Sequence, residues 1–188
     1  MHFQSIEFAS PAGDGPGSPR LIVLGAVHGN ETCGTEAIRR VVAEFESGAL
    51  ELLRGRVSFV PVTNPLAYAN QTRIGDRNLN RSLAPTDAPR EFEDRIANWL
   101  CPLLARHDAL LDLHSFHTAG APFVMVGPEN NAGALEAFSR AAEEAAFARA
   151  LGVTRFVDGW LDTYAVGVAR RRAAGYDADA RYGVGTTE

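Results

Sequence analysis

Apolar residues along the first part of the chain follow two different periods, and the change between them predicts strands that alternate with helices. Residues 21–27 form an unbroken apolar run, Leu-Ile-Val-Leu-Gly-Ala-Val, which is typical of a strand buried on both faces of a parallel sheet. A helix that ends near Gly48 is predicted next, because apolar residues recur on one helix face: Ile38, Val41, Val42 and Phe45. Residues 56–62 indicate a second strand.

Residues 64–89 are polar and show little periodicity, so we predict a long loop there, and long loops inside compact domains are often functional. A helix from Pro89 is predicted by an apolar stripe that comprises Phe92, Ile96, Trp99, Leu100, Leu103 and Leu104. Short strands follow at 109–113 and 122–126, and an Ala- and Glu-rich helix at 131–150. Beyond that helix the alternation weakens and the elements are left open. Strands interleaved with helices favour an α/β sandwich with a mostly parallel or mixed sheet.

Composition and charge narrow the classes of function. The 188 residues fit one domain, and 46% hydrophobic with 22% charged residues is ordinary for a globular protein. The formal net charge of −5 argues against nucleic acid as a partner. Cys33 and Cys101 lie far apart in the sequence, which argues against a disulfide framework. Residues 1–10 lack the features of a signal peptide, and no apolar run approaches the roughly 20 residues that cross a bilayer. We therefore expect a cytoplasmic protein that binds neither nucleic acid nor a membrane.

A histidine and a glutamate follow the first predicted strand, in the segment His28-Gly29-Asn30-Glu31. In an open α/β sheet, ligands bind beyond the carboxyl ends of the strands. A histidine and a carboxylate three residues apart can converge on one cation from a tight turn, which glycine permits. Taken alone, His28 is better explained as a hydrogen-bonded structural residue than as a metal ligand.

A second pair of polar residues ends the strand predicted at 109–113. Asp112 and His114 are two residues apart, so they lie on the same side of that strand. A carboxylate beside an imidazole commonly fixes the tautomer of a metal-bound histidine, and the alternative is a buried Asp–His hydrogen-bonded pair. Together, His28, Glu31 and His114 supply the ligand set of a catalytic zinc ion with one open position. This combination outweighs the separate structural explanations.

Three arginines lie in the predicted loop: Arg73, Arg77 and Arg81. Guanidinium groups bind carboxylates through paired hydrogen bonds and also stabilise a developing oxyanion. The alternative is a run of solvated charges. The position of this loop between the two candidate metal-binding segments favours an anion-binding role.

These segments, in this order, resemble the succinylglutamate desuccinylase/aspartoacylase family of the zinc carboxypeptidase-like superfamily. The resemblance rests on His28-Gly29-Asn30-Glu31, Asn64-Pro65, the loop from Arg73 to Asn80-Arg81, and Asp112-Leu113-His114-Ser115. It spans residues 21–115, over half of the chain. It implies a three-layer α/β sandwich with a mixed, mostly parallel sheet, and one zinc ion per chain.

The resemblance also implies a role for each matched residue. The zinc ligands would be His28, Glu31 and His114. The substrate would be bound by Asn64, Asn80 and Arg81, the last two at its free carboxylate. Arg73 would polarise the scissile carbonyl and hold its oxyanion, and Asp112 would support His114. Members of this family hydrolyse the amide bond of an N-acylated amino acid, or related amides, with water activated by zinc.

The chain departs from the family pattern at two points. Asn78 stands where the loop of the family usually has an aspartate, so a charge near the site is missing. The general base of the family is a glutamate in a later strand, and the only late glutamate here is the final residue, Glu188. Glu188 is therefore the candidate base, with the alternative that the true base lies outside this chain.

Residues 1–188 are accordingly predicted to form the catalytic domain of a zinc hydrolase that lacks the C-terminal region of the family. The expected reaction cleaves a C–N amide bond in a small carboxylate-bearing substrate, such as an N-acylated amino acid. Two alternatives stay open: a metallocarboxypeptidase that acts on peptides, and a zinc-binding module without turnover. Exposed sheet edges would permit self-association.

Overall fold

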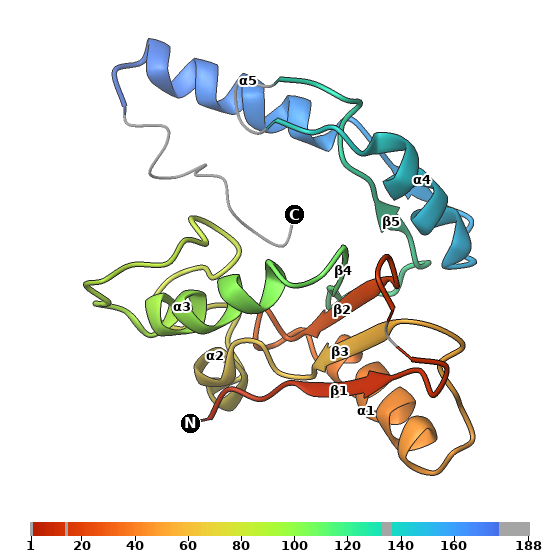
Figure 1. Cartoon of the computed structure of the whole chain (residues 1–188). Helices are drawn as coiled ribbons and strands as arrows, with labels where there is room; N and C mark the ends of the chain where they lie inside the picture. Colours follow the sequence, from red (N-terminus) through yellow and green to blue (C-terminus); the bar gives the residue numbers. More distant parts are fainter. Residues whose placement is uncertain (1, 14, 133–136, 177–188) are drawn as a thin grey trace. The chain divides into compact units, whose positions relative to one another are not determined.

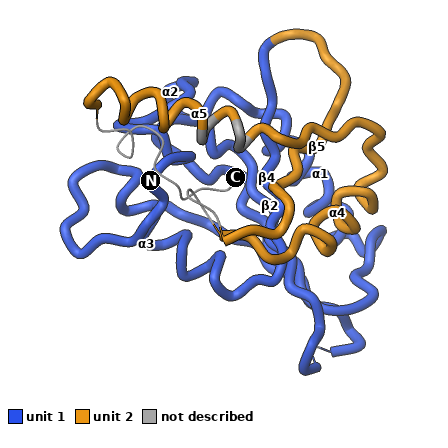
Figure 2. Tube along the Cα trace, turned by 90° about the horizontal axis from the view of Figure 1, so that it is seen from above, with its two compact units in different colours: residues 1–117, 187 blue, residues 118–186, 188 orange. Residues whose placement is uncertain are grey.

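The computed structural model describes residues 2–13, 15–132 and 137–176, whose contacts divide into two compact units (Figure 2). The first unit ends at His117 and the second begins at Thr118. A four-stranded sheet lies in the first unit, and a separate two-stranded sheet lies in the second.

The sheet of the first unit is mixed and mostly parallel, as predicted. Its strands are β1 (Ile6–Ala9), β2 (Arg20–Gly25), β3 (Arg56–Val60) and β4 (Ala109–Leu113), in the spatial order β1-β3-β2-β4. β2 pairs in parallel with both β3 and β4, whereas β1 pairs antiparallel with β3 at one edge. The predicted strands at 21–27, 56–62 and 109–113 are therefore confirmed as the three parallel strands.

Helices α1 (Cys33–Glu46) and α3 (Phe92–Leu104) cover the two faces of this sheet (Figure 1). Alternate residues of β2 belong to different layers, as the period of two requires. The core on the α3 side consists of Ile22, Leu24, Val27, Val60, Leu79, Ile96, Leu100 and Leu103. The core on the α1 side consists of Val23, Ile38, Val42, Val57 and Phe59. The three-layer α/β arrangement is thus confirmed.

The segment predicted as an unbroken loop contains a short helix, so that prediction was wrong at its beginning. α2 (Pro65–Asn70) is six residues long, with Pro65 in its first turn. The side chain of Asn64 accepts a hydrogen bond from the backbone N–H of Ala67 at 3.1 Å, which begins the helix. Six residues are too few for a hydrophobic period, so only this Asn-Pro start signal marks the helix in the sequence.

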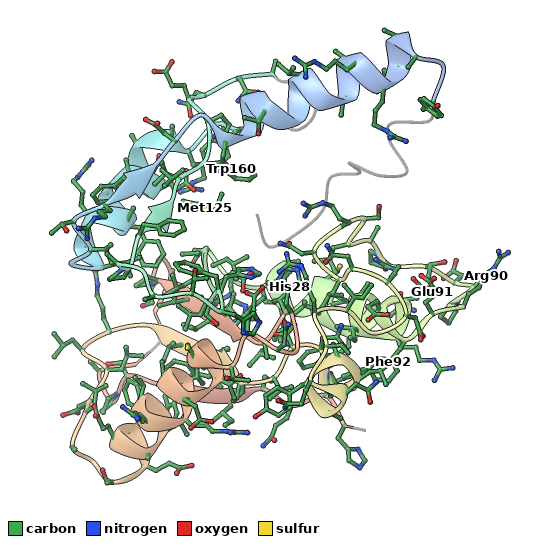
Figure 3. The ribbon with its side chains drawn as sticks, turned by 180° about the vertical axis from the view of Figure 1, so that it is seen from behind. His28, Arg90, Glu91, Phe92, Met125 and Trp160 are labelled. Atoms are coloured by element: carbon green, nitrogen blue, oxygen red, sulfur yellow. The ribbon has the colours of Figure 1, made fainter. Side chains whose placement is uncertain are left out.

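The second unit contains strands β5 (Val124–Met125) and β6 (Phe156–Val157), which pair in parallel. The indole N–H of Trp160 donates to the carbonyl of Val126 at 2.7 Å, beside the end of β5 (Figure 3). The strand predicted at 122–126 is therefore real but shorter than expected.

The helix predicted at 131–150 begins ten residues later, as α4 (Ala141–Ala150). Asn131 instead forms an isolated antiparallel bridge with Phe138. The side chain of Asn130 accepts a hydrogen bond from the backbone N–H of Ala141 at 2.9 Å, at the point where the helix starts. The Ala and Glu content therefore predicted the existence of α4 correctly, but not the residue at which it begins.

Helix α5 (Trp160–Ala173) lies where the sequence left the elements open. Its last turn carries Arg170, Arg171 and Arg172, and cations at this end of a helix oppose the negative pole of its dipole. Both α5 and α1 have 14 residues.

Across the described ranges, no helix combines the length and apolar character needed to cross a membrane.

Two glycines allow backbone segments around the end of β2 to approach closely. A Cβ atom added at Gly29 would lie 2.0 Å from the carbonyl carbon of Ala67 in α2. A Cβ atom at Gly34 would lie 2.6 Å from Cβ of Leu113, at the end of β4. The turn between β2 and α1 is therefore pressed between α2 and β4, where only glycine fits.

We predict that Gly29→Ala destabilises the protein, because the backbone of α2 must move to admit the new methyl group. Overpacking of this kind costs about 1–3 kcal/mol in the free energy of unfolding, or more where backbone is displaced. Urea unfolding measures this loss, with Gly15→Ala as the control, since a Cβ atom there meets nothing within 4 Å. Equal stability of the two variants would contradict the close approach.

Candidate metal centre

The ends of β2 and β4 bring three side chains to the same edge of the sheet. His28 follows β2, Glu31 precedes α1, and His114 directly follows β4. β2 and β4 are parallel neighbours with Gly25 opposite Leu113, so their carboxyl ends coincide. The backbone N–H of Glu31 donates to the carbonyl of His28 at 3.1 Å, which closes the turn and directs both side chains to one point.

The polar atoms of these three residues converge. Nδ1 of His28 lies 2.9 Å from Oε1 of Glu31, and Nδ1 of His114 lies 2.8 Å from Oε2 of the same carboxylate. The two Nδ1 atoms are 3.2 Å apart. One ligand atom from each residue lies within 4.8 Å of the others. The structure therefore brings together the three residues that the sequence analysis selected as metal ligands.

Burial differs across this cluster and gives it an open side. His28 and Glu31 retain 2% and 5% of their surface, whereas the His114 side chain retains 33%. In Figure 3, His28 lies within the dense side chains of the first unit. Access from solvent is therefore on the His114 side, where a substrate or water would reach the cluster.

Glu31 is held in its ionised form. Burial alone would raise the pKa of its carboxyl, but hydrogen bonds from His114, His28 and the backbone N–H of Ser115 outweigh burial and leave the pKa well below its ordinary value. The Ser115 contact is 3.0 Å long. Arg73 adds an ion pair, with Nη1 2.5 Å from Oε1 of Glu31.

His114 is held between two carboxylates. Burial alone would lower its pKa, but hydrogen bonds to Asp112 and Glu31 outweigh burial and raise the pKa to about 10. Nε2 of His114 lies 2.6 Å from Oδ2 of Asp112, whose side chain is only 5% exposed. The pairing of Asp112 with His114 expected from the period of two is therefore present.

The donor set fits a zinc ion because both imidazoles direct Nδ1 into the cluster. Nε2 of His114 faces Asp112, and Nε2 of His28 lies 3.2 Å from Oδ1 of Asn78. These oxygen acceptors can hold a proton on Nε2 of each ring, so a ring that gives up its Nδ1 proton would present that lone pair to the centre. Without a metal, protons on Nδ1 serve the hydrogen bonds to Glu31, and a zinc ion would displace those protons and bind the same atoms. Two histidines and one glutamate form a three-residue set that catalytic zinc sites use.

The loop from Arg73 to Arg81, called the arginine loop below, contributes some of its residues to this centre. Arg73 contacts Glu31 and keeps 58% of its side chain exposed. Asn78 accepts from His28 and also from the backbone N–H of Asn80 at 2.9 Å. Its neutral amide oxygen is thus the hydrogen-bond acceptor at the position where the family resemblance implies an aspartate. Asn80 is buried, and Arg81 donates from Nη1 to its carbonyl.

Of the two remaining predicted site residues, the structure describes only Asn64. Asn64 is fully buried, and its side chain is engaged by Ala67 and by Oε1 of Glu93 at 2.8 Å. This arrangement holds the start of α2, and a contact with substrate stays a prediction. Glu188 lies outside the described residues, so its role as the general base also stays a prediction.

Glu93 is a buried acidic residue that the sequence reasoning missed. Its side chain is fully buried on α3 and contacts the arginine loop. The signal was present in the sequence, because Glu93 recurs with Ile96, Ala97 and Leu100 on the apolar face of the helix. A charged residue on such a face must find hydrogen-bond partners inside the protein.

The comparison with protein families decides the assignment. Residues 17–155 match the family model described as the succinylglutamate desuccinylase/aspartoacylase catalytic domain. This match covers the sheet of the first unit from β2 onward together with all residues of the cluster. The chain belongs to the succinylglutamate desuccinylase/aspartoacylase family.

Individual relatives agree with this family. The succinylglutamate desuccinylase of Shewanella amazonensis is 37% identical over 68 residues, which are 36% of this chain and 19% of that protein. The crystal structure of an aspartoacylase family protein from Mesorhizobium loti is similar with a TM-score of 0.69 at 27% identity, over 84% of this chain and 48% of that one.

A third relative is the product-bound structure of the ectoine utilization protein EutE (DoeB) from Ruegeria pomeroyi. It is similar with a TM-score of 0.59 at 25% identity, over 74% of this chain and 42% of that one. The succinylglutamate desuccinylase/aspartoacylase chain described here thus spans less than half the length of these relatives.

The raised pKa of His114 predicts how the stability of the metal-free protein depends on pH. The pKa rises from 6.5 to about 10 in the folded state, so the native state binds this proton more tightly than the unfolded chain. The resulting stabilisation is complete below pH 6.5 and is lost as the pH rises to about 10.

Urea unfolding of the metal-free protein and of His114→Gln measures this contribution. The difference in their free energies of unfolding should shrink steadily as the pH rises from about 6 to about 10. His117→Gln is the control, because this histidine is exposed and lies outside the cluster. A difference between parent and His114→Gln that stays constant with pH would contradict the account of the cluster.

Proposed function

We propose that this chain is the zinc-binding part of a hydrolase that cleaves a C–N amide bond in a small carboxylate-bearing substrate, such as an N-acylated amino acid. His28, Glu31 and His114 would hold one zinc ion. A zinc ion held in this way supplies Lewis acidity and makes water a stronger nucleophile near neutral pH. The family of the chain and the names of its relatives support the class of substrate.

The observation that carries the proposal is the convergence of two Nδ1 atoms and the Glu31 carboxylate, at 2.8 to 3.2 Å from one another. The Nε2 atoms face Asp112 and Asn78, so both rings turn Nδ1 toward the cluster. Once zinc displaces the Nδ1 protons, three electron-pair donors would surround one point, with solvent access on one side.

Arginine and asparagine side chains beside the cluster would bind and orient the substrate. The guanidinium of Arg73 lies next to Glu31 and is more than half exposed, so it can reach the carbonyl oxygen of a substrate that enters from solvent. There it would stabilise the negative charge that develops in a tetrahedral transition state. Asn80 and Arg81 would orient the free carboxylate of the substrate, since guanidinium groups match carboxylates in geometry.

Proton transfer needs one further group. A general base must lie within hydrogen-bond reach of the attacking water, and Asp112 is unsuited because it is committed to His114 at 2.6 Å. Glu31 is committed to the metal site. We propose Glu188 for this role, and Glu188→Gln is then expected to retain zinc and lose turnover.

Metal content tests the proposal directly. Protein purified without added metal is expected to contain about one zinc ion per chain by elemental analysis, and His114→Ala should lose it. His117→Ala is the matched control and should retain its zinc. Zinc-loaded parent protein should hydrolyse N-acylated amino acids, whereas His114→Ala should be inactive.

Three other outcomes have distinct meanings. A parent protein that binds no zinc even when it is supplied would contradict the proposal. Zinc binding with faster hydrolysis of peptides than of N-acylated amino acids would identify a metallocarboxypeptidase. Zinc binding without turnover of either substrate would identify a binding module.

A further inference from the structure

Glu93 accepts hydrogen bonds from four donors while its side chain is fully buried. Its Oε1 atom receives the amide N–H of Asn64 at 2.8 Å and the backbone N–H of Gly75 at 3.1 Å. Its Oε2 atom receives the backbone N–H groups of Asp76 and Arg77, each at 3.2 Å. Three consecutive backbone donors of the arginine loop therefore converge on one carboxylate, and this compensates for the cost of burying its charge.

The carboxylate of Glu93 is not required to begin α3. The first turn of this helix is capped by its neighbours, because Glu91 and Asp94 form a capping box. The backbone N–H of Phe92 donates to Oδ2 of Asp76 at 2.8 Å. Figure 3 labels Arg90, Glu91 and Phe92 at this helix start. Glu93 lies in the first turn of α3, but its carboxylate contacts the loop and Asn64 rather than the backbone of the helix.

The loop segment fixed by Glu93 is flanked by the residues that contact the metal ligands. Arg73 precedes Gly75 by two positions and pairs with Glu31. Asn78 follows Arg77 directly and accepts from Nε2 of His28. Fixing the backbone from Gly75 to Arg77 therefore sets the position of both contacts.

We propose that Glu93 is a positioning residue that holds the loop so that Arg73 reaches Glu31 and Asn78 reaches His28. Its effect on zinc affinity and turnover rests on the proposed function, whereas its effect on the loop does not. A neutral side chain of the same shape cannot replace it, because an amide group would present an N–H donor to backbone donors. Buried donors left without a partner destabilise their segment.

Amide hydrogen exchange, resolved by residue, tests the positioning itself. In Glu93→Gln, the N–H groups of Gly75, Asp76 and Arg77 should exchange at least about tenfold faster than in the parent, while the strands of the sheet are unchanged. Glu144→Gln is the matched control, because Glu144 accepts the backbone N–H of Gly127 at 3.0 Å in the second unit. It should leave exchange in the arginine loop unaltered.

Zinc affinity and turnover test the consequence for the site. Loss of the Asn78 contact with His28 should weaken zinc binding about 10–100-fold in Glu93→Gln, by competition with a chelator. At saturating zinc, kcat should fall more than KM rises, because the loop positions Arg73 for the transition state. A parent protein without zinc or activity would contradict the proposed function, yet the exchange measurement would still decide the role of Glu93.

A second variant tests the proposal even if Glu93→Gln does not fold. A Cβ atom at Gly75 would lie 2.4 Å from Oε1 of Glu93, so Gly75→Ala should displace the loop while every charge is kept. In a Glu93→Ala background the same change should have a smaller effect, since only a 3.1 Å contact with Cδ2 of Leu66 then remains. Unchanged exchange at residues 75–77 in Gly75→Ala, or equal effects of this change in both backgrounds, would overturn the proposal.

Discussion

The parallel pairing of β2 with β4 is the constraint on which the candidate centre depends. The register that places Gly25 opposite Leu113 brings two chain segments together that are far apart in sequence. His28 and His114 then meet with 3.2 Å between their Nδ1 atoms. A shift of this register by one residue would turn His114 and Asp112 to the other face of the sheet. The close approach at Gly34 completes the arrangement, since it lets α1 start against β4.

Two buried carboxylates organise the two halves of the site. Glu31 gathers the histidines, Arg73 and the backbone of Ser115. Glu93 gathers the backbone of the arginine loop and the Asn64 side chain. Both are satisfied by several donors, which is the condition under which a charge persists inside a protein. Arg73 joins the two halves, because its backbone belongs to the loop of Glu93 and its guanidinium contacts Glu31.

The sequence was most informative where a long hydrophobic period or an ordered motif exists. The buried run at 21–27 and the stripe from Phe92 to Leu104 correspond to β2 and α3. The candidate ligands His28, Glu31 and His114 were selected because each follows or adjoins a predicted strand end, and their atoms converge in the structure. Period two also placed Asp112 beside His114 correctly.

Features that depend on packing between distant segments were not predictable in this way. α2 is too short to show a period, and the start of α4 depends on the Asn130 contact with Ala141. The pairing of Asn78 with His28 joins residues 50 positions apart, and no local pattern specifies it. Glu93 was visible only as a charge on an apolar face, whose partners are defined once the loop folds over it.

X-ray absorption spectroscopy at the zinc edge tests the central claim, that His28, Glu31 and His114 together hold the metal. The account predicts a first coordination sphere of nitrogen and oxygen only, with imidazole scattering and zinc–nitrogen distances of about 2.0–2.1 Å. Cys33 begins α1 two residues after Glu31 and is exposed, so its thiolate is a competing ligand that this spectrum distinguishes. A sulfur scatterer at about 2.3 Å, or a sphere without imidazole, would contradict the claim.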